Sequence, residues 1–136
     1  MPATLKLEIV TPEAKVYSED VEMVTLTGID GEMGIYPDHM PVMTQLVAGE
    51  VIARKDGANL FLAVGDGFVQ ITGKRVAILT DMAVKEGDID EAKAEEAQRK
   101  AEARLTQKLS DEEAATVQAS LVHAATQLKV KRLHKK

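Results

Sequence analysis

Three histidines are the residues best suited to catalysis or metal binding. Their spacing, however, fits no common catalytic or metal site. His39 lies in a segment dense in glycine and proline, whereas His123 and His134 belong to the charged C-terminal part. No two of them have metal-ligand spacing, and no acid–histidine–acid cluster accompanies them. We expect His39 to make hydrogen bonds within a loop and His123 to face solvent from a helix. The pattern favours an interaction module over an enzyme.

Other catalytic and nucleotide-binding motifs are also missing from the sequence. It contains no cysteine, which excludes disulfides and thiolate metal sites, and no G-x-S-x-G nucleophile motif. The glycine-rich segments 28–34 and 65–67 lack the spacing and the following Lys-Ser/Thr of a phosphate-binding loop. Turns that require positive φ explain these glycines better. A small enzyme with an unrecognised site near His39 remains an alternative, which predicts that His39→Ala loses activity but keeps the fold.

Length and hydropathy indicate one soluble-type unit without a membrane span. The chain has 136 residues, close to the ~150 typical of one domain. The longest uncharged run, 114–128, contains Thr, Gln and Ser and is shorter than the ~20 apolar residues that a spanning helix needs. Lys6 and Glu8 interrupt the apolar stretch at the N-terminus, where a secretory signal would be uncharged. We therefore expect membrane association only through a partner.

Charge is distributed unevenly along the chain. Acidic residues outnumber basic ones in 1–87, whereas 88–136 has a slight basic excess that gathers at its end. The basic tail comprises Lys129, Lys131, Arg132, Lys135 and Lys136. Such a tail can bind nucleic acid or an acidic protein surface, or it can simply complement the negative end of a helix dipole. An acidic body without interleaved aromatic and basic residues argues against nucleic acid. Salt-sensitive binding to random DNA would reveal a free-standing nucleic-acid module.

Alternation of apolar and polar residues predicts β-strands up to about residue 85. In the segment 5–9, Leu5, Leu7 and Ile9 share one face, and Lys6 and Glu8 share the other. Similar runs follow, and Asp-Gly at 56–57 and Gly-Lys at 73–74 are typical of hairpin turns. We predict an antiparallel β-sandwich, or a related barrel, over residues 1–87.

Helical periodicity replaces the alternation from residue 88 onward. Asp88 with Glu91, and Ser110 with Glu113, are each typical of a helix start. Apolar residues recur every three or four positions at Ala94, Ala97, Ala101, Leu105, Leu109, and then at Ala114, Val117, Leu121, Ala125 and Leu128. We predict helices over 88–109 and 110–132, folded back as an antiparallel hairpin in residues 88–136. The fold class is α+β.

The predicted seam between these helices is rich in alanine. Small side chains bury little apolar area, and burial contributes ~25 cal/mol per Å². The hairpin could therefore detach from the sandwich and act as a moving part. The alternative is an ordinary stable appendage, which the seam taken alone favours.

The loop over 31–41 carries a resemblance to a known family. Its sequence GEMGIYPDHMP is similar to the Gly-x-Leu/Met-Gly-Ile-Leu/Tyr-Pro-x-His-x-Pro loop of the epsilon subunits of bacterial F-type ATP synthases. The matching residues are Gly31, Met33, Gly34, Ile35, Tyr36, Pro37, His39 and Pro41. Tyr36 in place of leucine resembles the proteobacterial-type version. The segments 11–24 and 87–103 also resemble this family, so the likeness covers nearly the whole chain.

This resemblance implies a non-catalytic subunit of the central stalk. Its sandwich would bind the gamma subunit and touch the ring of c subunits, coupling ring rotation to the catalytic head. Stiff glycine–proline loops lower the ordering cost of binding. The loop residues implied in these contacts are Asp30, Glu32, Met33, Ile35, Tyr36 and His39. The chain would lie at the cytoplasmic face of the bacterial inner membrane, peripherally, within the synthase; the coupling ion is left open.

The same resemblance makes the helical hairpin a regulatory arm. In one state it folds against the sandwich, and in the other it extends along gamma and blocks rotation in the direction of ATP hydrolysis. Lys129, Lys131 and Arg132 would then meet a carboxylate-rich segment of the catalytic beta subunit within the alpha/beta head. The positive charge of these residues has the sign that such a contact needs.

Some members of this family bind ATP at the hairpin through Ile/Leu-Asp-x-x-Arg-Ala. Ile89, Asp90 and Ala94 match this motif, but Lys93 stands where arginine is expected. Lysine keeps the charge and loses the planar fork of guanidinium. Asp90 could equally serve as an acid in the first turn of a helix. We expect weak ATP binding at most and no other cofactor or metal.

Overall fold

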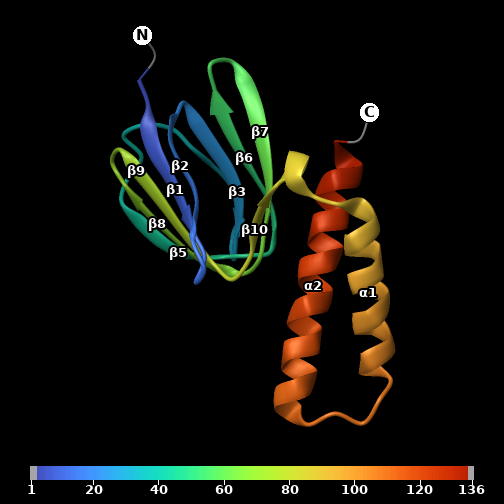
Figure 1. The fold of residues 1–136 in the computed structure, drawn as a ribbon. Coiled ribbons are helices and arrows are strands. Elements are labelled where there is room, and N and C mark those ends of the chain that lie inside the picture. The colour runs from blue at the N-terminus through green and yellow to red at the C-terminus, as the bar shows by residue number, and fades with distance from the viewer. Residues whose placement is uncertain (1–2, 135–136) are drawn as a thin grey trace.

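The computed structural model describes residues 3–134, which form a β-rich body and a two-helix arm (Figure 1). The body contains ten strands. They are β1 (Leu5–Val10), β2 (Lys15–Val21), β3 (Met23–Gly28), β4 (Gly31–Ile35), β5 (Val42–Leu46), β6 (Gly49–Lys55), β7 (Ala58–Val64), β8 (Gly67–Thr72), β9 (Arg75–Thr80) and β10 (Ala83–Lys85). A short 3₁₀ turn, η1 (Glu86–Asp88), leads to the helices α1 (Glu91–Leu105) and α2 (Asp111–Leu133). The predicted α+β fold, a sandwich followed by a helical hairpin, is confirmed.

The strands pair in the order β10-β7-β6-β3-β5-β8-β9-β1-β2, and β4 pairs with β3. Every described pairing is antiparallel except that of β1 with β9, which are parallel. The prediction of an all-antiparallel body is therefore wrong at one place. A parallel pair needs a long connection between its strands, and the chain from β1 to β9 runs through most of the sandwich.

The alternating segments build the core as predicted. Leu7 and Ile9 of β1 are fully buried, while Lys6 between β1's core positions is exposed. The predicted turn at 56–57 joins β6 to β7, with positive φ at both Asp56 (53°) and Gly57 (78°), as tight hairpins require. The turn at 73–74 likewise joins β8 to β9. The inward faces thus form one aliphatic core.

The start of α2 matches its prediction, whereas the start of α1 does not. Ser110 and Glu113 form a capping box, in which each side chain bonds the other's backbone N–H. Asp90, rather than Asp88, caps α1, because its carboxylate accepts a hydrogen bond from the Lys93 N–H at 3.1 Å. Asp88 lies in η1 instead. The helix α1 also ends at Leu105, short of the predicted 109.

The buried stripe of each helix differs in part from the predicted one. On α1, Ala94 and Ala101 are buried, but Ala97 is exposed. On α2, the buried residues are Val117, Ala124, Leu128 and Val130. The predicted Ala125 is only half-buried. The helix α2 contacts both α1 and the sandwich, so its buried residues cover more than one stripe.

The C-terminal half of α2 lies beside β7, and its N-terminal half extends past the sandwich next to α1 (Figure 1). A second apolar cluster of Ala63, Met82, Ile89 and Val130, separate from the sandwich core, fills this contact. No helix in residues 3–134 is long and apolar enough to cross a bilayer.

Candidate functional site

The loop over 31–41 is formed by β4 and the turn that follows it. Gly31 begins the loop with φ at 124°, a value that favours glycine over residues with a Cβ. The Asp38 N–H donates to the carbonyl of Gly73 at 2.6 Å, which ties the loop to the β8–β9 turn. His39 Nδ1 lies 2.7 Å from the Met40 carbonyl oxygen, so the expected loop hydrogen bond of His39 is confirmed.

The predicted contact residues of this loop differ in exposure. Asp30, Glu32 and Tyr36 are exposed, whereas Met33 and His39 are half-buried. Ile35 has 0% of its surface exposed and belongs to the sandwich core. Ile35 therefore fixes the position of the loop, while Asp30, Glu32 and Tyr36 expose polar or aromatic groups to solvent.

An exposed apolar patch on the outer face of the sheet was missed by the sequence analysis. We call Met43, Phe68 and Leu79 the outer patch; 69%, 52% and 51% of their surfaces are exposed, respectively. Phe68 pairs directly with Leu79 across β8 and β9, and Met43 lies diagonally across on β5. Its signal was available, because Phe68 alternates with buried Val69 and so must point outward. Large apolar side chains grouped on one face are typical of interaction surfaces.

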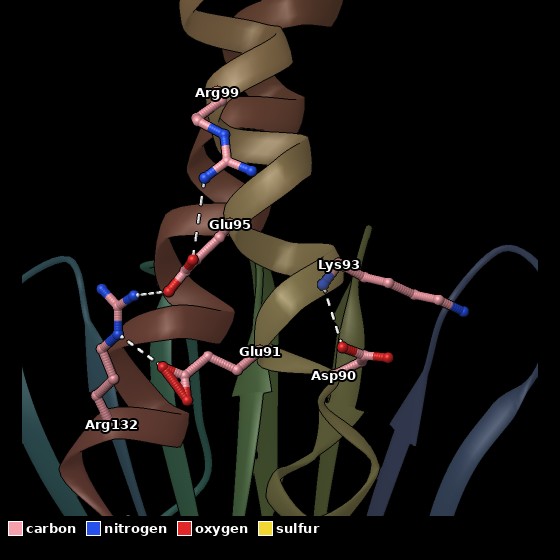
Figure 2. A network of polar contacts seen from close by, with 6 residues as sticks. All are labelled: Asp90, Glu91, Lys93, Glu95, Arg99 and Arg132. Carbon is pink, nitrogen blue, oxygen red and sulfur yellow. Dashed lines mark hydrogen bonds and ion pairs between the residues drawn. The ribbon is translucent and has the colours of Figure 1, made fainter.

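The cations of the tail have partners within the arm and the sandwich. Arg132 donates through Nε to Glu91 at 3.2 Å and through a second nitrogen to Glu95, which joins α2 to α1 (Figure 2). The hydrogen bond to Glu91 raises the pKa of the Arg132 guanidinium, so the group stays charged. Lys131 Nζ lies 3.6 Å from a carboxylate oxygen of Glu86.

The third predicted cation differs from these two. Lys129 is exposed and lines a groove of about 430 Å³ between α2 and the strands β3 and β6. The predicted Lys135 and Lys136 lie outside the described residues.

The residues that match the ATP-binding motif all have structural roles. Ile89 is buried in the second apolar cluster, Asp90 caps α1, and Ala94 is buried against α2. The Lys93 side chain extends away from the Arg132 network in Figure 2. Lys93 and Ala94 also line a hollow of about 310 Å³ between the two helices. The motif therefore builds the base of the hairpin whether or not a nucleotide binds.

Both histidines of α2 contact carboxylates on the sandwich. His123 Nε2 lies 3.1 Å from Asp81 Oδ2 and is only partly exposed, so the expectation that it faces solvent is wrong. His134 bonds Glu50 and stacks on Phe61, with the ring centroids 3.5 Å apart. Residues 3–134 hold no group of three or more His, Cys, Asp or Glu that could bind a metal ion.

Comparison with known proteins decides the family. The ATP synthase delta/epsilon chain beta-sandwich domain matches residues 4–86, and the long alpha-helix domain of the same chain matches 88–132. An ATP synthase epsilon chain from Dehalococcoides mccartyi is 44% identical over 129 residues, covering 94% of this chain and 92% of the relative. The chain belongs to the ATP synthase epsilon chain family. The epsilon chain of Herpetosiphon aurantiacus is 37% identical over 131 residues, covering 96% of both chains. These comparisons do not test whether Tyr36 marks the proteobacterial type of loop, which stays a prediction.

Solved structures show the same fold. A chain of the Euglena gracilis mitochondrial ATP synthase superimposes with a TM-score of 0.74 at 23% identity, covering 98% of this epsilon chain and 84% of that chain. A chain from the central stalk and c-ring of the Tetrahymena thermophila enzyme gives 0.62 at 14% identity, with 96% and 98% covered. An epsilon chain is a subunit of the ATP synthase and is not itself catalytic.

Proposed function

We propose that this epsilon chain couples rotation of the c-ring through gamma to the catalytic head and inhibits ATP hydrolysis through its hairpin. It works peripherally at the cytoplasmic face of the bacterial inner membrane, held there by the complex. The observation that carries this proposal is the pairing of the hairpin's cations with acids of the same chain. Lys131 and Arg132 contact Glu86, Glu91 and Glu95. Another carboxylate-rich surface could replace these acids when the hairpin extends.

Partly exposed ion pairs suit such an exchange, because pairs near the surface each contribute only ~0–1 kcal/mol. Arg132 is half exposed, and its partners come from the same arm, so leaving them exposes no deeply buried charge. The catalytic beta subunit would supply the new carboxylates. Lys129 is already exposed and free to meet them first.

Deletion of residues 88–136 tests the role of the hairpin. We expect the truncated chain to assemble with gamma and the c-ring but to relieve inhibition of ATP hydrolysis. The assay compares hydrolysis and ATP synthesis by synthase reconstituted with the full or the truncated chain. Inhibition of equal strength by both chains would rule out the hairpin.

A single cation gives a sharper test than deletion. Lys129→Ala removes a charge without touching the pairs of Lys131 and Arg132, so it should weaken inhibition and leave the docked hairpin unchanged. Lys108→Ala, which removes an exposed cation between α1 and α2, is the matched control. Equal hydrolysis rates for the two variants would argue against a contact through Lys129.

We assign the outer patch to gamma and the loop over 31–41 to the c-ring and gamma. Support comes from the exposure of Phe68 and Leu79 and from the polar groups of Asp30, Glu32 and His39. Replacing both Phe68 and Leu79 by serine should abolish co-elution with purified gamma on a sizing column. Gln70→Ser, on the same face, should not. Two separate peaks for the unchanged chain and gamma would refute this assignment.

We further propose that ATP binds weakly at the hollow between the helices, near Lys93 and Ala94. The hollow and the motif support this, while lysine in place of arginine limits the affinity. Amide signals of α1 and α2 in nuclear magnetic resonance spectra should shift at millimolar ATP and shift more in Lys93→Arg. Unchanged spectra for both chains would exclude a site there.

A further inference from the structure

The contact between α2 and the sandwich holds a histidine at each end. His123 lies in the middle of α2, opposite the β9–β10 turn, and His134 forms the C-cap of the helix, opposite β6 and β7. They are separated by about three helical turns, so they mark the two ends of the docked half. Between them, Val130 fills the second apolar cluster.

Each histidine meets a carboxylate of the sandwich. His123 Nε2 is 3.1 Å from Asp81 Oδ2, and His134 Nε2 bonds a carboxylate oxygen of Glu50. His134 and Glu50 are both mostly buried, with 21% and 19% of their side chains exposed. A protonated imidazole attracts the carboxylate and donates to it, whereas a neutral ring retains only a hydrogen bond.

The His134 ring also lies against an aromatic face and at a helix terminus. Its ring stacks on Phe61 of β7, and a cationic ring gains from an aromatic face. At the C-cap of α2 it lies at the negative end of the helix dipole. Lys129 and Glu32, which carry opposite charges, line the groove that also contains Glu50. The Lys131 ammonium is directed to Glu86 instead.

A lysine shares the hollow that His123 lines. Lys93 of α1 lines the same hollow as His123, together with the uncharged Ser120 and Gln127. Asp81 is in direct contact, whereas Lys93 is exposed to solvent. The backbone of Gly65 packs against the pair, since a Cβ there would lie 2.0 Å from Asp81 Oδ1 and 3.2 Å from His123 Nε2. The His123–Asp81 pair is therefore closely packed against the sandwich.

We propose that His123 and His134 form a proton-dependent latch, which holds the hairpin on the sandwich at acid pH and weakens as the pH rises. Histidine is the side chain that ordinarily changes charge between pH 5 and 8, and carboxylates are ionised over that range. The latch is a property of this chain alone and does not depend on what the extended hairpin does. If extension inhibits hydrolysis, as proposed above, alkaline pH favours the inhibitory state.

Single-molecule energy transfer on the full chain measures the ratio of docked to detached hairpins. The chain has no cysteine, so Gln70→Cys on β8 and Ala119→Cys on α2, both exposed, accept dyes specifically. Partly exposed ion pairs predict a change of about threefold per pair, and hence roughly tenfold for both, between pH 5.5 and 8. The ratio should fall as the pH rises.

The chain supplies its own control histidine. The variant with both His123→Gln and His134→Gln should lose the pH dependence, as should Glu50→Gln with Asp81→Asn. His39→Gln, which changes the histidine outside the hairpin contact, should keep the pH dependence of the docked-to-detached ratio. Far-ultraviolet circular dichroism checks that each variant folds. A ratio that is independent of pH, a hairpin that never detaches, or equal pH dependence in the double-glutamine variant would each overturn the proposal.

Discussion

Val130→Ala should release the hairpin from the sandwich without unfolding either part. Val130 has 2% of its surface exposed and packs with Ala63, Met82 and Ile89. Losing two buried carbons costs about 1.6 kcal/mol at ~0.8 kcal/mol for each, and a residual cavity brings this to about 2.5 kcal/mol. Alanine favours the helix more than valine does, but α2 stays helical in both states, so this gain cancels.

That loss corresponds to a decrease of roughly 15- to 70-fold in the ratio of docked to detached hairpins. The energy-transfer assay on the doubly labelled chain measures this ratio directly, and the melting temperature of the sandwich should stay unchanged. Leu133→Ala is the matched control, because Leu133 is on the same helix with 65% of its surface exposed. An equal shift in both variants, or a sandwich that melts together with the hairpin in Val130→Ala, would refute the reasoning.

Three further changes test the sandwich and the helix caps. Gly67→Ala places a Cβ 1.9 Å from a main-chain carbonyl oxygen of β9, which cannot move aside easily. This substitution should therefore destabilise the sandwich by about 3 kcal/mol and lower its melting temperature. Gly73→Ala, which has open space around it, is the control and should leave the melting temperature unchanged. Ser110→Ala removes the capping box and should destabilise α2 by about 1 kcal/mol, seen as reduced helicity at rising temperature. The hydrogen bond from Lys15 lowers the pKa of Glu8 below its ordinary 4.5. The ionised Glu8 therefore contributes to folding stability above pH 4.5, and this contribution is lost as the pH falls through the lowered pKa. Glu8→Gln should therefore reduce the loss of folding stability at acid pH. An unchanged loss of stability in this variant would contradict the reasoning.

The faces of the strands could be predicted from the sequence, but the pairings between strands that no tight turn joins could not. Alternation shows which residues point inward, as Leu7 and Ile9 do. It carries no information on which strand lies alongside, and tight turns identify only antiparallel neighbours. The parallel pairing of β1 with β9 joins strands far apart in the chain, so neither signal could reveal it.

The start of α1 shows how packing decides between two equivalent caps. Asp88 and Asp90 are both suitable N-caps by residue type. Ile89 is buried with Val130 and Met82, which fixes the backbone at this point and leaves Asp90 as the residue before the first turn. The contact that made the choice lies in α2, outside the window in which caps are recognised.

The candidate sites also differ in how far local sequence could predict them. The loop over 31–41 could be singled out from the sequence because its residues are consecutive and resemble a family signature, and its contacts stay a prediction. The carboxylate partners of His123 and His134 lie in the sandwich, far from these residues in the chain. No spacing rule connects them, and each histidine alone is typical of a solvated helix. The outer patch could be predicted in part. Alternation shows that its residues point outward, but only the strand order shows that Met43 lies near Phe68.

The way α2 is attached supports the proposed detachment of the arm. The two helices bury three alanines together with Val117, Leu128 and Val130. Of these, Val130 fills the small cluster with Ala63, Met82 and Ile89, and pairs that involve His123 and His134 flank this contact with the sandwich. A larger apolar interface would hold the helix permanently, because each further buried leucine or isoleucine contributes ~1.5–3 kcal/mol that no change of pH or partner offsets. Polar pairs contribute less and depend on protonation and on competing charges. A small apolar contact bordered by histidine–carboxylate pairs therefore suits an arm that, as proposed, both docks on the sandwich and leaves it.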